Sequence, residues 1–528
     1  MSIKKNITSG AGIMGVATLV SRVLGFLRDA IIAAFFGAGF VADAFFVAFR
    51  VSNLLRRLAG EGALTPSFVP VFTEVLEKKT RAEAERFVSG AFTIFFIMLT
   101  LLAVLGVIFA ENLIALMSPG FSASPGKAEL ATNLTRLMFP YMVFIGLMAL
   151  SMGVLNSFKH FTAPALSPIF FNISIIVSVL LLSPILNEPV YAIAWGVLIG
   201  GFLQFVIQLP FLKKYGMLPR PLFILGDPAI KKVFILMAPA ALGIGVYQLN
   251  NIIVLRFASE LIEGSVSYLY YASRLIELPL GIFAVSVATA VLPSLSEFAV
   301  KKDYESFKES LSFSLKLTNL VTIPATIGLC ILGVHIVELL FARGAFGATE
   351  VSGTVFALYF YALGIVPIAT SRILVSVFFA MKDSKTPFYV ALITVVFNIA
   401  ACLFLMKPLG HGGLALATTL SALLNMICLF GVLKVKFGSF KVGSVLKDAL
   451  KSIIAATFMA LIVYSLSFLF NWNALGTLGK IIVLGVEILI GVGVYFGVCR
   501  VLKVEEVTFL LALVVKKVNK VGSKGESN

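Results

Sequence analysis

Apolar runs long enough to cross a lipid bilayer follow one another along almost the whole chain. A transmembrane helix needs about 20 mainly apolar residues, and fourteen runs near this length are separated by short polar segments. They lie near residues 11–36, 41–58, 87–110, 134–156, 162–184, 190–212, 231–258, 265–293, 312–341, 353–380, 386–406, 411–434, 449–470 and 478–502. Because open sheet edges are not tolerated in lipid, the pattern predicts an all-α polytopic membrane protein with 14 transmembrane helices.

Basic residues are concentrated in alternate connections between these runs. Lysines and arginines follow the even-numbered runs, whereas the other connections are poor in base and carry acids such as Glu111, Glu188 and Glu260. Cytoplasmic loops carry the excess of Lys and Arg, so both termini are predicted to be cytoplasmic. Arg22 and Arg28 interrupt the first apolar run, which favours a retained span over a cleaved signal peptide.

An internal repeat organises the predicted helices. The sequence features of one half recur in the other in the same order, about 223 positions later: Arg50, Pro70, Glu74 and Lys78-Lys79 recur as Arg274, Pro293, Glu297 and Lys301-Lys302, and Phe171-Asn172-Ile173 recurs as Phe397-Asn398-Ile399. The repeat predicts an N-terminal lobe over residues 1–220, a C-terminal lobe over 221–440, and two extra helices with a basic tail over 441–528. Parallel repeats of this kind place a substrate site between the two lobes.

Composition agrees with the membrane class and limits the chemistry. The chain is 59% hydrophobic and 13% charged, whereas soluble domains are about 25% charged. The net charge of +16 is dispersed among short loops, which argues against nucleic-acid binding. The histidines and cysteines lack metal-ligand spacing, and no Walker A motif is present, so neither a metal site nor a cofactor is predicted. These residues are His160, His335, His411, Cys330, Cys402, Cys428 and Cys499.

Charged residues inside the apolar runs are the main candidates for function. A guanidinium at mid-bilayer depth costs roughly 2.5–3.5 kcal/mol, so such residues face a partner or a wet cavity. The deep bases outnumber the deep acids: Arg22, Arg28, Arg50, Arg56, Arg57 and Arg274 accompany only Asp29, Asp43 and Glu277. Because arginine forms forked contacts with phosphate, this surplus predicts an anionic ligand. Asn53 lies at the margin of the stripe formed by Asp43, Arg50 and Arg57.

Several of these charges have structural alternatives. Arg56 and Arg57 lie near the cytoplasmic end of the second run, where they could be interfacial anchors. Arg22 with Asp29, and Arg274 with Glu277, share helix faces and could be structural ion pairs. Arg50 is expected to support the site, paired with Asp43.

The segment after the second run is a candidate gate. Gly60-Glu61-Gly62, followed by Pro66 and Pro70, breaks the helical pattern just beyond the Arg pair. An ordinary irregular connection would show the same pattern, so both interpretations stay open.

Specific motifs resemble one family over essentially the whole chain. These motifs are Ser21-Arg22-Val23-Leu24-Gly25-Phe26-Leu27-Arg28-Asp29, Asp43-Ala44-Phe45-Phe46, Asn53-Leu54-Leu55-Arg56-Arg57, Tyr270-Tyr271-Ala272-Ser273-Arg274-Leu275-Ile276-Glu277 and Lys382-Asp383-Ser384-Lys385-Thr386-Pro387. Together they resemble the MurJ (MviN) lipid II flippases of the multidrug/oligosaccharidyl-lipid/polysaccharide exporter superfamily. The resemblance implies two six-helix lobes, two extra helices, and a location in the bacterial cytoplasmic (inner) membrane.

The same resemblance implies a transport function and a set of site residues. The expected substrate is the undecaprenyl-pyrophosphate-linked peptidoglycan precursor, moved from the inner to the outer leaflet by alternating access, with no enzymatic step. Arg22, Arg28, Arg56 and Arg274 match arginines that the family requires, and Asn53 and Glu277 are expected beside them. The last two helices are expected to hold the lipid tail. Membrane lipids and other cell-wall synthesis proteins are the expected partners.

Three other functions and the energy source stay open at this point. A drug or polysaccharide-lipid exporter of the same superfamily is the nearest alternative, and an intramembrane enzyme and a non-transporting scaffold are the others. Sodium-coupled members of the family carry carboxylates on the seventh and eleventh helices. The corresponding runs here offer Asn250, Asn251 and Asn398, which favours driving by the membrane potential.

Overall fold

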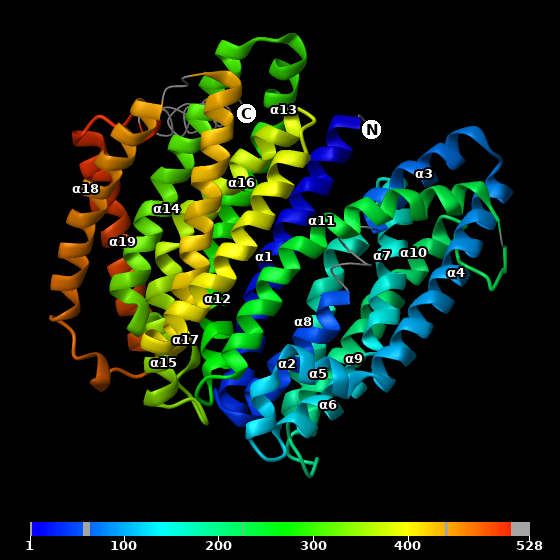
Figure 1. Ribbon diagram of the computed structural model, residues 1–528, viewed down its shortest axis with the longest axis horizontal. Helices are drawn as coiled ribbons and strands as arrows, with labels where there is room; N and C mark the ends of the chain where they lie inside the picture. Colours follow the sequence, from blue (N-terminus) through cyan, green and yellow to red (C-terminus); the bar gives the residue numbers. More distant parts are fainter. Residues whose placement is uncertain (1–2, 56–63, 225, 439–441, 508–528) are drawn as a thin grey trace, which may run out of the picture. The chain divides into compact units, whose positions relative to one another are not determined.

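The computed structural model describes residues 3–55, 64–224, 226–438 and 442–507 (Figure 1). Within these ranges the regular elements are helices, and no strand occurs among them. Nine of the helices described are long and apolar enough to cross a membrane, or up to ten if the pair Ala348–Leu363 and Ile365–Ala380, bent by 43°, forms one span. The predicted all-α membrane fold is therefore confirmed, whereas the total of 14 spans stays a prediction.

The chain divides into two compact units. The first comprises Met1–Ser267 with Phe341–Glu350, and the second comprises Tyr268–Leu340 with Val351–Asn528. The lobe boundaries near residues 220 and 440, which were inferred from the sequence repeat, stay a prediction.

Helices of the first unit are named as in Figure 1. They are α1 (Ile3–Phe36), α2 (Phe40–Leu55), α3 (Leu64–Lys78), α4 (Arg81–Ile108), α5 (Ala110–Met117), η2 (Pro119–Ala123), α6 (Lys127–Met138), α7 (Tyr141–Ser157), α8 (Thr162–Leu182), α9 (Tyr191–Val206), α10 (Leu209–Lys214) and α11 (Pro228–Ser259). Helix α8 packs against both α1 and α9, and α2 packs against α6. These packings bring α8 beside the charged part of α1.

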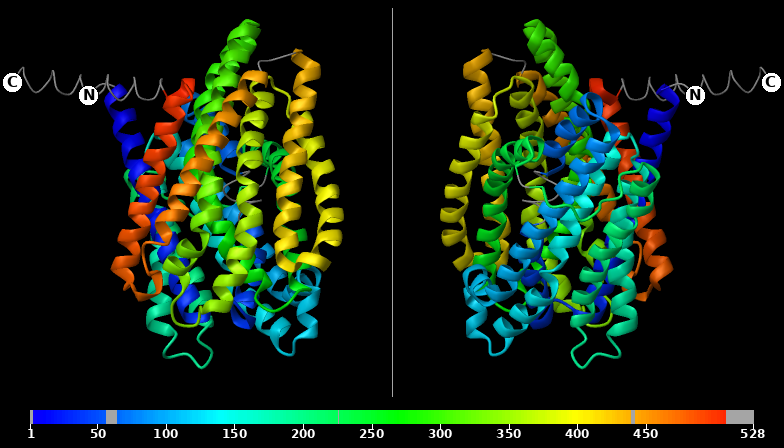
Figure 2. Two further views of the ribbon diagram at one scale, coloured as in Figure 1. Left: turned by 90° about the vertical axis from the view of Figure 1, so that its left-hand side faces the viewer. Right: turned by 90° about the vertical axis from the view of Figure 1, so that its right-hand side faces the viewer.

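Helices of the second unit begin at the boundary with α12. They are α12 (Ser265–Pro279), η3 (Leu280–Ala284), α13 (Val285–Lys301), α14 (Tyr304–Phe341), α15 (Ala348–Leu363), α16 (Ile365–Ala380), α17 (Lys385–Phe437), α18 (Val442–Ser467), η4 (Trp472–Ala474) and α19 (Thr477–Val501). Helices α18 and α19 lie side by side (Figure 2). Together with α14 they enclose an apolar core that includes Leu332, Met459 and Leu484.

Local sequence signals explain several helix boundaries. Thr80 and Glu83 form a reciprocal capping box at the start of α4, which satisfies backbone N–H groups that have no partner within the helix. The Asp227 side chain accepts hydrogen bonds from the first turn of α11, and Pro228 occupies its first position. Inside α17, Gly410 has φ 53° and ψ −133°. That backbone break separates the two apolar runs predicted at 386–406 and 411–434.

The two copies of the repeated motif take the same local structure. Glu74 pairs with Lys78 at 2.9 Å near the end of α3, and Glu297 pairs with Lys301 at 2.6 Å near the end of α13. The backbone also matches where a helix ends after each copy: Lys159 follows α7 and Lys382 follows α16, and both have φ 58°. Lys302 after α13 and Lys503 after α19 also have a positive φ, so this left-handed lysine is a helix ending used several times in the chain, and it occurs at both equivalent positions of the repeat.

Candidate functional site

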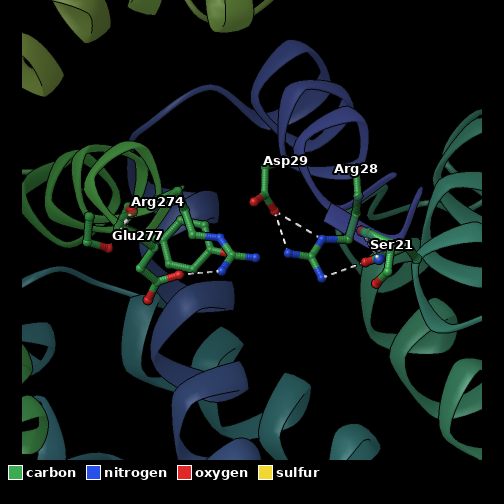
Figure 3. A network of polar contacts seen from close by, with 8 residues as sticks. Ser21, Arg28, Asp29, Arg274 and Glu277 are labelled. Atoms are coloured by element: carbon green, nitrogen blue, oxygen red, sulfur yellow. Dashed lines mark hydrogen bonds and ion pairs between the residues drawn. The ribbon is translucent and has the colours of Figure 1, made fainter. Parts of the chain in front are cut away.

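Arg28 lies within a buried polar cluster on α1 of the first unit (Figure 3). Its Nε and Nη2 groups donate to Oδ1 of Asp29 at 3.0 and 2.6 Å, and Nη1 donates to Oδ1 of Asn172 on α8 at 3.2 Å. The Asn172 amide in turn donates from Nδ2 to the Ser21 carbonyl oxygen at 3.0 Å. Arg28 is 6% exposed and Asp29 is 1% exposed. Contacts from two helices therefore hold the guanidinium in a defined orientation.

This cluster explains how a buried cation is tolerated at that depth. Removing one partner of a buried ion pair typically costs about 3–5 kcal/mol, because the other charge is left uncompensated. Asp29 supplies the compensating charge to Arg28, and the hydrogen bond to Asn172 fixes the plane of the fork. A phosphate oxygen offers the same acceptor chemistry as the Asp29 carboxylate. The arrangement can therefore exchange a protein acceptor for an anionic ligand.

Arg22 does not take part in the structural ion pair that the sequence left open. Its side chain is partly exposed on α1, and the Asp29 carboxylate is bonded to Arg28. Among the described residues, no contact joins Arg22 to Asp29. The seven-residue spacing places Arg22 and Asp29 on one helix face, but the carboxylate is bonded by the adjacent residue, Arg28.

Asp43 is buried and paired, but its partner is not Arg50. Its Oδ2 accepts from Lys127 Nζ at 2.9 Å and from the Gly264 amide at 2.8 Å, while Oδ1 accepts from the Ser267 amide and hydroxyl at 2.9 and 2.6 Å. The expected pairing of Asp43 with Arg50 is therefore wrong. Asp43 is instead bound by the Gly264 amide just before α12, by the amide and hydroxyl of Ser267 in the first turn of α12, and by the Lys127 ammonium at the start of α6.

Arg274 lies on α12, which belongs mainly to the second unit. Its Nη1 donates to Oε2 of Glu277 at 2.8 Å, and its guanidinium lies 5.6 Å from the Tyr270 ring centroid (Figure 3). The Arg274 side chain is 30% exposed and that of Glu277 is 55% exposed. An ion pair this exposed contributes at most about 1 kcal/mol, so an anion can replace Glu277 at little cost. Immediately afterwards, Pro279 precedes the π-helical turn η3.

The remaining predicted residues are placed only in part. Arg50 and Asn53 are partly buried on α2. Arg56, Arg57 and the gate candidates Gly60, Glu61 and Gly62 lie outside the described residues.

Sequence reasoning missed two residues that build this part of the molecule. Asn172 appeared in the repeated Phe-Asn-Ile tripeptide, and a polar residue conserved within an internal repeat was a usable signal. Lys127 offered none, because its position at the start of α6 resembles an ordinary loop lysine. The Lys127 side chain is nevertheless only 5% exposed, and its ammonium lies 4.6 Å from the Phe121 ring centroid.

One cluster of acids in the second unit could resemble a metal site. Asp448, Glu505 and Glu506 have ligand atoms within 4.8 Å of one another. The Lys316 ammonium lies 2.7 Å from Asp448, 3.3 Å from Glu505 and 3.7 Å from Glu506. A lysine already supplies the positive charge, so this cluster is an ion network that ties α14 to α18 and the segment after α19. Burial raises the pKa of Glu506.

Comparison with known proteins assigns the family. The family model described as "Lipid II flippase MurJ" matches residues 32–484. This chain belongs to the MurJ family. A probable lipid II flippase MurJ of Bdellovibrio bacteriovorus is 35% identical over 507 residues, covering 96% of both proteins. The lipid II flippase MurJ of Burkholderia cenocepacia is 35% identical over 492 residues, covering 92% of this chain and 95% of that protein. The family expected from the sequence motifs is confirmed.

Solved structures support the same MurJ assignment. A lipid II flippase MurJ in an inward closed conformation matches with a TM-score of 0.78 and 30% identity, over 93% of this chain and 98% of that one. A multidrug resistance MATE family transporter in an inward-facing conformation has a TM-score of 0.66 at 14% identity, over 81% of this chain and 99% of that one. At this identity the MATE likeness concerns the fold alone. The chain is therefore a multi-pass membrane protein of the MurJ family.

Proposed function

We propose that this chain moves lipid II, the undecaprenyl-pyrophosphate-linked peptidoglycan precursor, from the inner to the outer leaflet of the cytoplasmic membrane. Membership of the MurJ family carries the substrate class. The observation that supports it chemically is the buried, oriented Arg28, since an arginine fork suits a pyrophosphate oxygen pair. In this proposal both termini are cytoplasmic, following the distribution of Lys and Arg.

The proposed pyrophosphate ligands are the arginines that match the family motif. Arg28 and Arg274 are the principal pair, with Arg22 from the same helix as Arg28, and with Arg56. Arg28 would exchange Asp29 for substrate, and Arg274 would exchange Glu277. Both carboxylates then serve the resting state, because they neutralise the guanidiniums when no anion is bound. Asn53 and Glu277 complete the proposed site, and Asp29, Asp43, Arg50 and Arg57 support it.

The proposed cycle is alternating access. The sugar–peptide head enters a wet cavity from the cytoplasmic side, the two lobes rearrange, and the head is released outside while the lipid tail stays in the membrane. Gly60, Glu61 and Gly62 are candidates for a gate. Apolar side chains exposed on α18 and α19, such as Leu461 and Leu489, support the proposal that these helices take the tail.

Membrane potential is the proposed energy source. The helix α11 of the seventh predicted span contains Asn250 and Asn251 but no acid, and Asn251 donates to Gln248 at 3.3 Å. On α17 the buried Asn398 accepts only from the Cys402 thiol among the described contacts, at 2.9 Å. Neither arrangement supplies the carboxylate oxygen that a tightly held sodium ion prefers. Flipping should therefore depend on a potassium–valinomycin potential and not on sodium.

Reconstitution of the full chain tests both the function and the arginines. Purified protein is placed in liposomes with fluorescent lipid II, and leaflet exchange is followed by quenching from outside. Arg28→Ala and Arg274→Ala should each abolish exchange while leaving insertion and elution unchanged. Arg136→Ala is the matched control, because Arg136 is an exposed arginine on α6 that contacts Asn133. Full exchange by both site variants would contradict their proposed role.

Substrate competition separates lipid II flipping from drug or polysaccharide-lipid export. Unlabelled lipid II should compete with the fluorescent substrate, whereas cationic drugs and polyprenyl-phosphate sugars lacking the peptide should not. Competition by the drugs instead would favour the exporter alternative.

A further inference from the structure

A single acid interrupts the apolar sequence of α19. Glu487 is the one charged residue between Lys480 and Arg500. It lies ten residues after Thr477, the start of the helix, which corresponds to about 15 Å along the axis at 1.5 Å per residue. Ionisable residues at such depth are rare and are usually functional. The proposed site arginines do not account for this acid.

The Glu487 carboxyl is buried without a hydrogen-bond partner. Its side chain is 1% exposed, and within the described residues neither carboxyl oxygen has a hydrogen-bond partner. Nδ1 of His335 on α14 lies 4.0 Å from Oε2. This Nδ1 atom is likewise buried and has no hydrogen-bond partner among the described residues. Two groups that can each bind a proton therefore face each other, and within the described residues neither the carboxyl oxygens nor Nδ1 has a hydrogen-bond partner.

The surroundings of the pair are apolar on one side and polar on the other. On α18, Met459 and Val463 contact α19 at Gly491, one turn from Glu487. Toward the end of α14, the His335 ring stacks on Trp472 with centroids 4.2 Å apart, and Trp472 Nε1 donates to Glu338. Lys480 lies 5.3 Å from the Trp472 ring centroid. Glu338 and Lys480 are thus the charged groups described on the elements around His335.

His335 connects the buried carboxyl to this polar end. The His335 side chain is 21% exposed, and it lies six residues before Phe341, where α14 ends. Charge alternation places the end of α14 and the α18–α19 connection on the outer side of the membrane. A proton arriving from outside would therefore meet His335 before Glu487.

We propose that Glu487 and His335 form a proton-binding site, loaded from the outer side, that couples flipping to the proton gradient. With one proton bound, the apolar surroundings hold that proton on the carboxyl, because they disfavour a pair of charges. The pair is then a neutral acid beside a neutral imidazole, and its net charge is zero. Loss of that proton to the aqueous phase leaves one uncompensated negative charge between α14 and α19. Histidine and one carboxylate suit a proton better than sodium, which prefers several oxygen ligands.

The site joins α14, a helix of the C-terminal repeat, to α19, one of the two extra helices, so the charge of the site controls how these helices pack. When the proton is bound, the neutral pair is compatible with the apolar core shared by α14, α18 and α19. When it is absent, the buried charge disfavours that packing. This coupling rests on the proposed flipping function. A proton that enters from outside to the depth of Glu487 crosses part of the transmembrane electric field, so the site would use part of the membrane potential.

Infrared spectroscopy of the wild-type protein tests proton binding directly. The full chain in liposomes should show a carboxylic-acid C=O band that disappears in Glu487→Gln and persists in Glu111→Gln, a control on an exposed acid of α5. Glutamine mimics the neutral acid, so the variant is expected to fold. If wild-type protein lacks the carboxylic-acid band, the proposal is overturned without any variant. It is also overturned if the band persists in Glu487→Gln.

Flipping at varied external pH tests the coupling. At a fixed potential, the wild-type rate should change with external pH by up to about tenfold per unit, the limit for one titrating proton. Glu487→Gln should abolish this dependence, and His335→Gln should shift it. An unchanged pH profile in Glu487→Gln, or control by sodium with no effect of pH, would overturn the coupling. A Glu487 band without any flipping would uphold the proton site and refute the proposed function, and these two failures are therefore distinguishable.

Discussion

Replacing Asn172 by leucine is expected to slow flipping without removing any charge. Asn172 accepts from Arg28 Nη1 at 3.2 Å and donates to the Ser21 carbonyl at 3.0 Å, so it braces α8 against α1 at the level of the guanidinium. Leucine has nearly the same shape and makes neither bond. The hydrogen bond from a charged donor contributes about 1.5–3 kcal/mol. If the variant loses this free energy in the transition state of flipping, because Arg28 is no longer held in position, the flipping rate falls roughly tenfold to hundredfold.

The internal repeat supplies a matched control for this change. Asn398 is the counterpart of Asn172, is also buried, and accepts from Cys402 Sγ at 2.9 Å. No described contact joins Asn398 to an arginine, and its Nδ2 is buried without a partner among the described residues. Asn398→Leu should therefore flip lipid II at close to the wild-type rate.

The assay is leaflet exchange of fluorescent lipid II in proteoliposomes at equal protein content. Elution profiles and thermal unfolding in detergent establish that both leucine variants are folded. The reasoning is refuted if Asn172→Leu flips at the wild-type rate, or if Asn398→Leu loses as much activity as Asn172→Leu.

Two further predictions concern stability. Asp43→Asn should lower the free energy of unfolding by about 3–5 kcal/mol, because it leaves the buried Lys127 ammonium without a counter-charge. In a double-mutant cycle, adding Lys127→Met should recover part of this loss. Additive effects of the two substitutions would contradict the pairing. Burial of Asp383 opposes its ionisation, but hydrogen bonds from Lys436 and Thr386 outweigh burial and lower the pKa of Asp383 from 3.8 to about 2. Its stabilisation, about 1 kcal/mol after allowing for the exposure of Lys436, should be complete above pH 3.8 and lost as the pH falls through about 2. Unfolding of wild type and Asp383→Asn across this interval tests the sign, and a difference that grows on acidification would refute it.

The sequence was sufficient for the fold class and the family because both depend on repeated or local signals. A hydrophobic run has to be a helix in lipid, since its backbone groups have no other partner there. The motif around Arg28 and Arg274 likewise identified the family that the comparison confirmed. Glu74 with Lys78, and Glu297 with Lys301, are four residues apart, and pairs at this spacing follow from helix geometry alone.

Pairing between distant charges could not be predicted in the same way. Helix periodicity placed Asp29 near Arg22 and Asp43 near Arg50, yet the structure pairs Asp29 with Arg28 and Asp43 with Lys127. A carboxylate binds the donors that packing brings to it. For Asp43 those donors come from residues 84 or more positions away, whereas Asp29 binds the adjacent Arg28. Periodicity describes one helix at a time and carries no information about the neighbour.

The sequence by itself determined a membrane-embedded helical chain with an internal repeat and an excess of deep arginines, because hydrophobicity, charge and spacing are properties of short segments. Only the tertiary structure decided which charges compensate one another. It placed Asn172 of α8 against Arg28 and the start of α12 against Asp43, and it left Glu487 on α19 facing His335 on α14. These choices depend on helix packing, which selects among many contacts that the sequence permits equally.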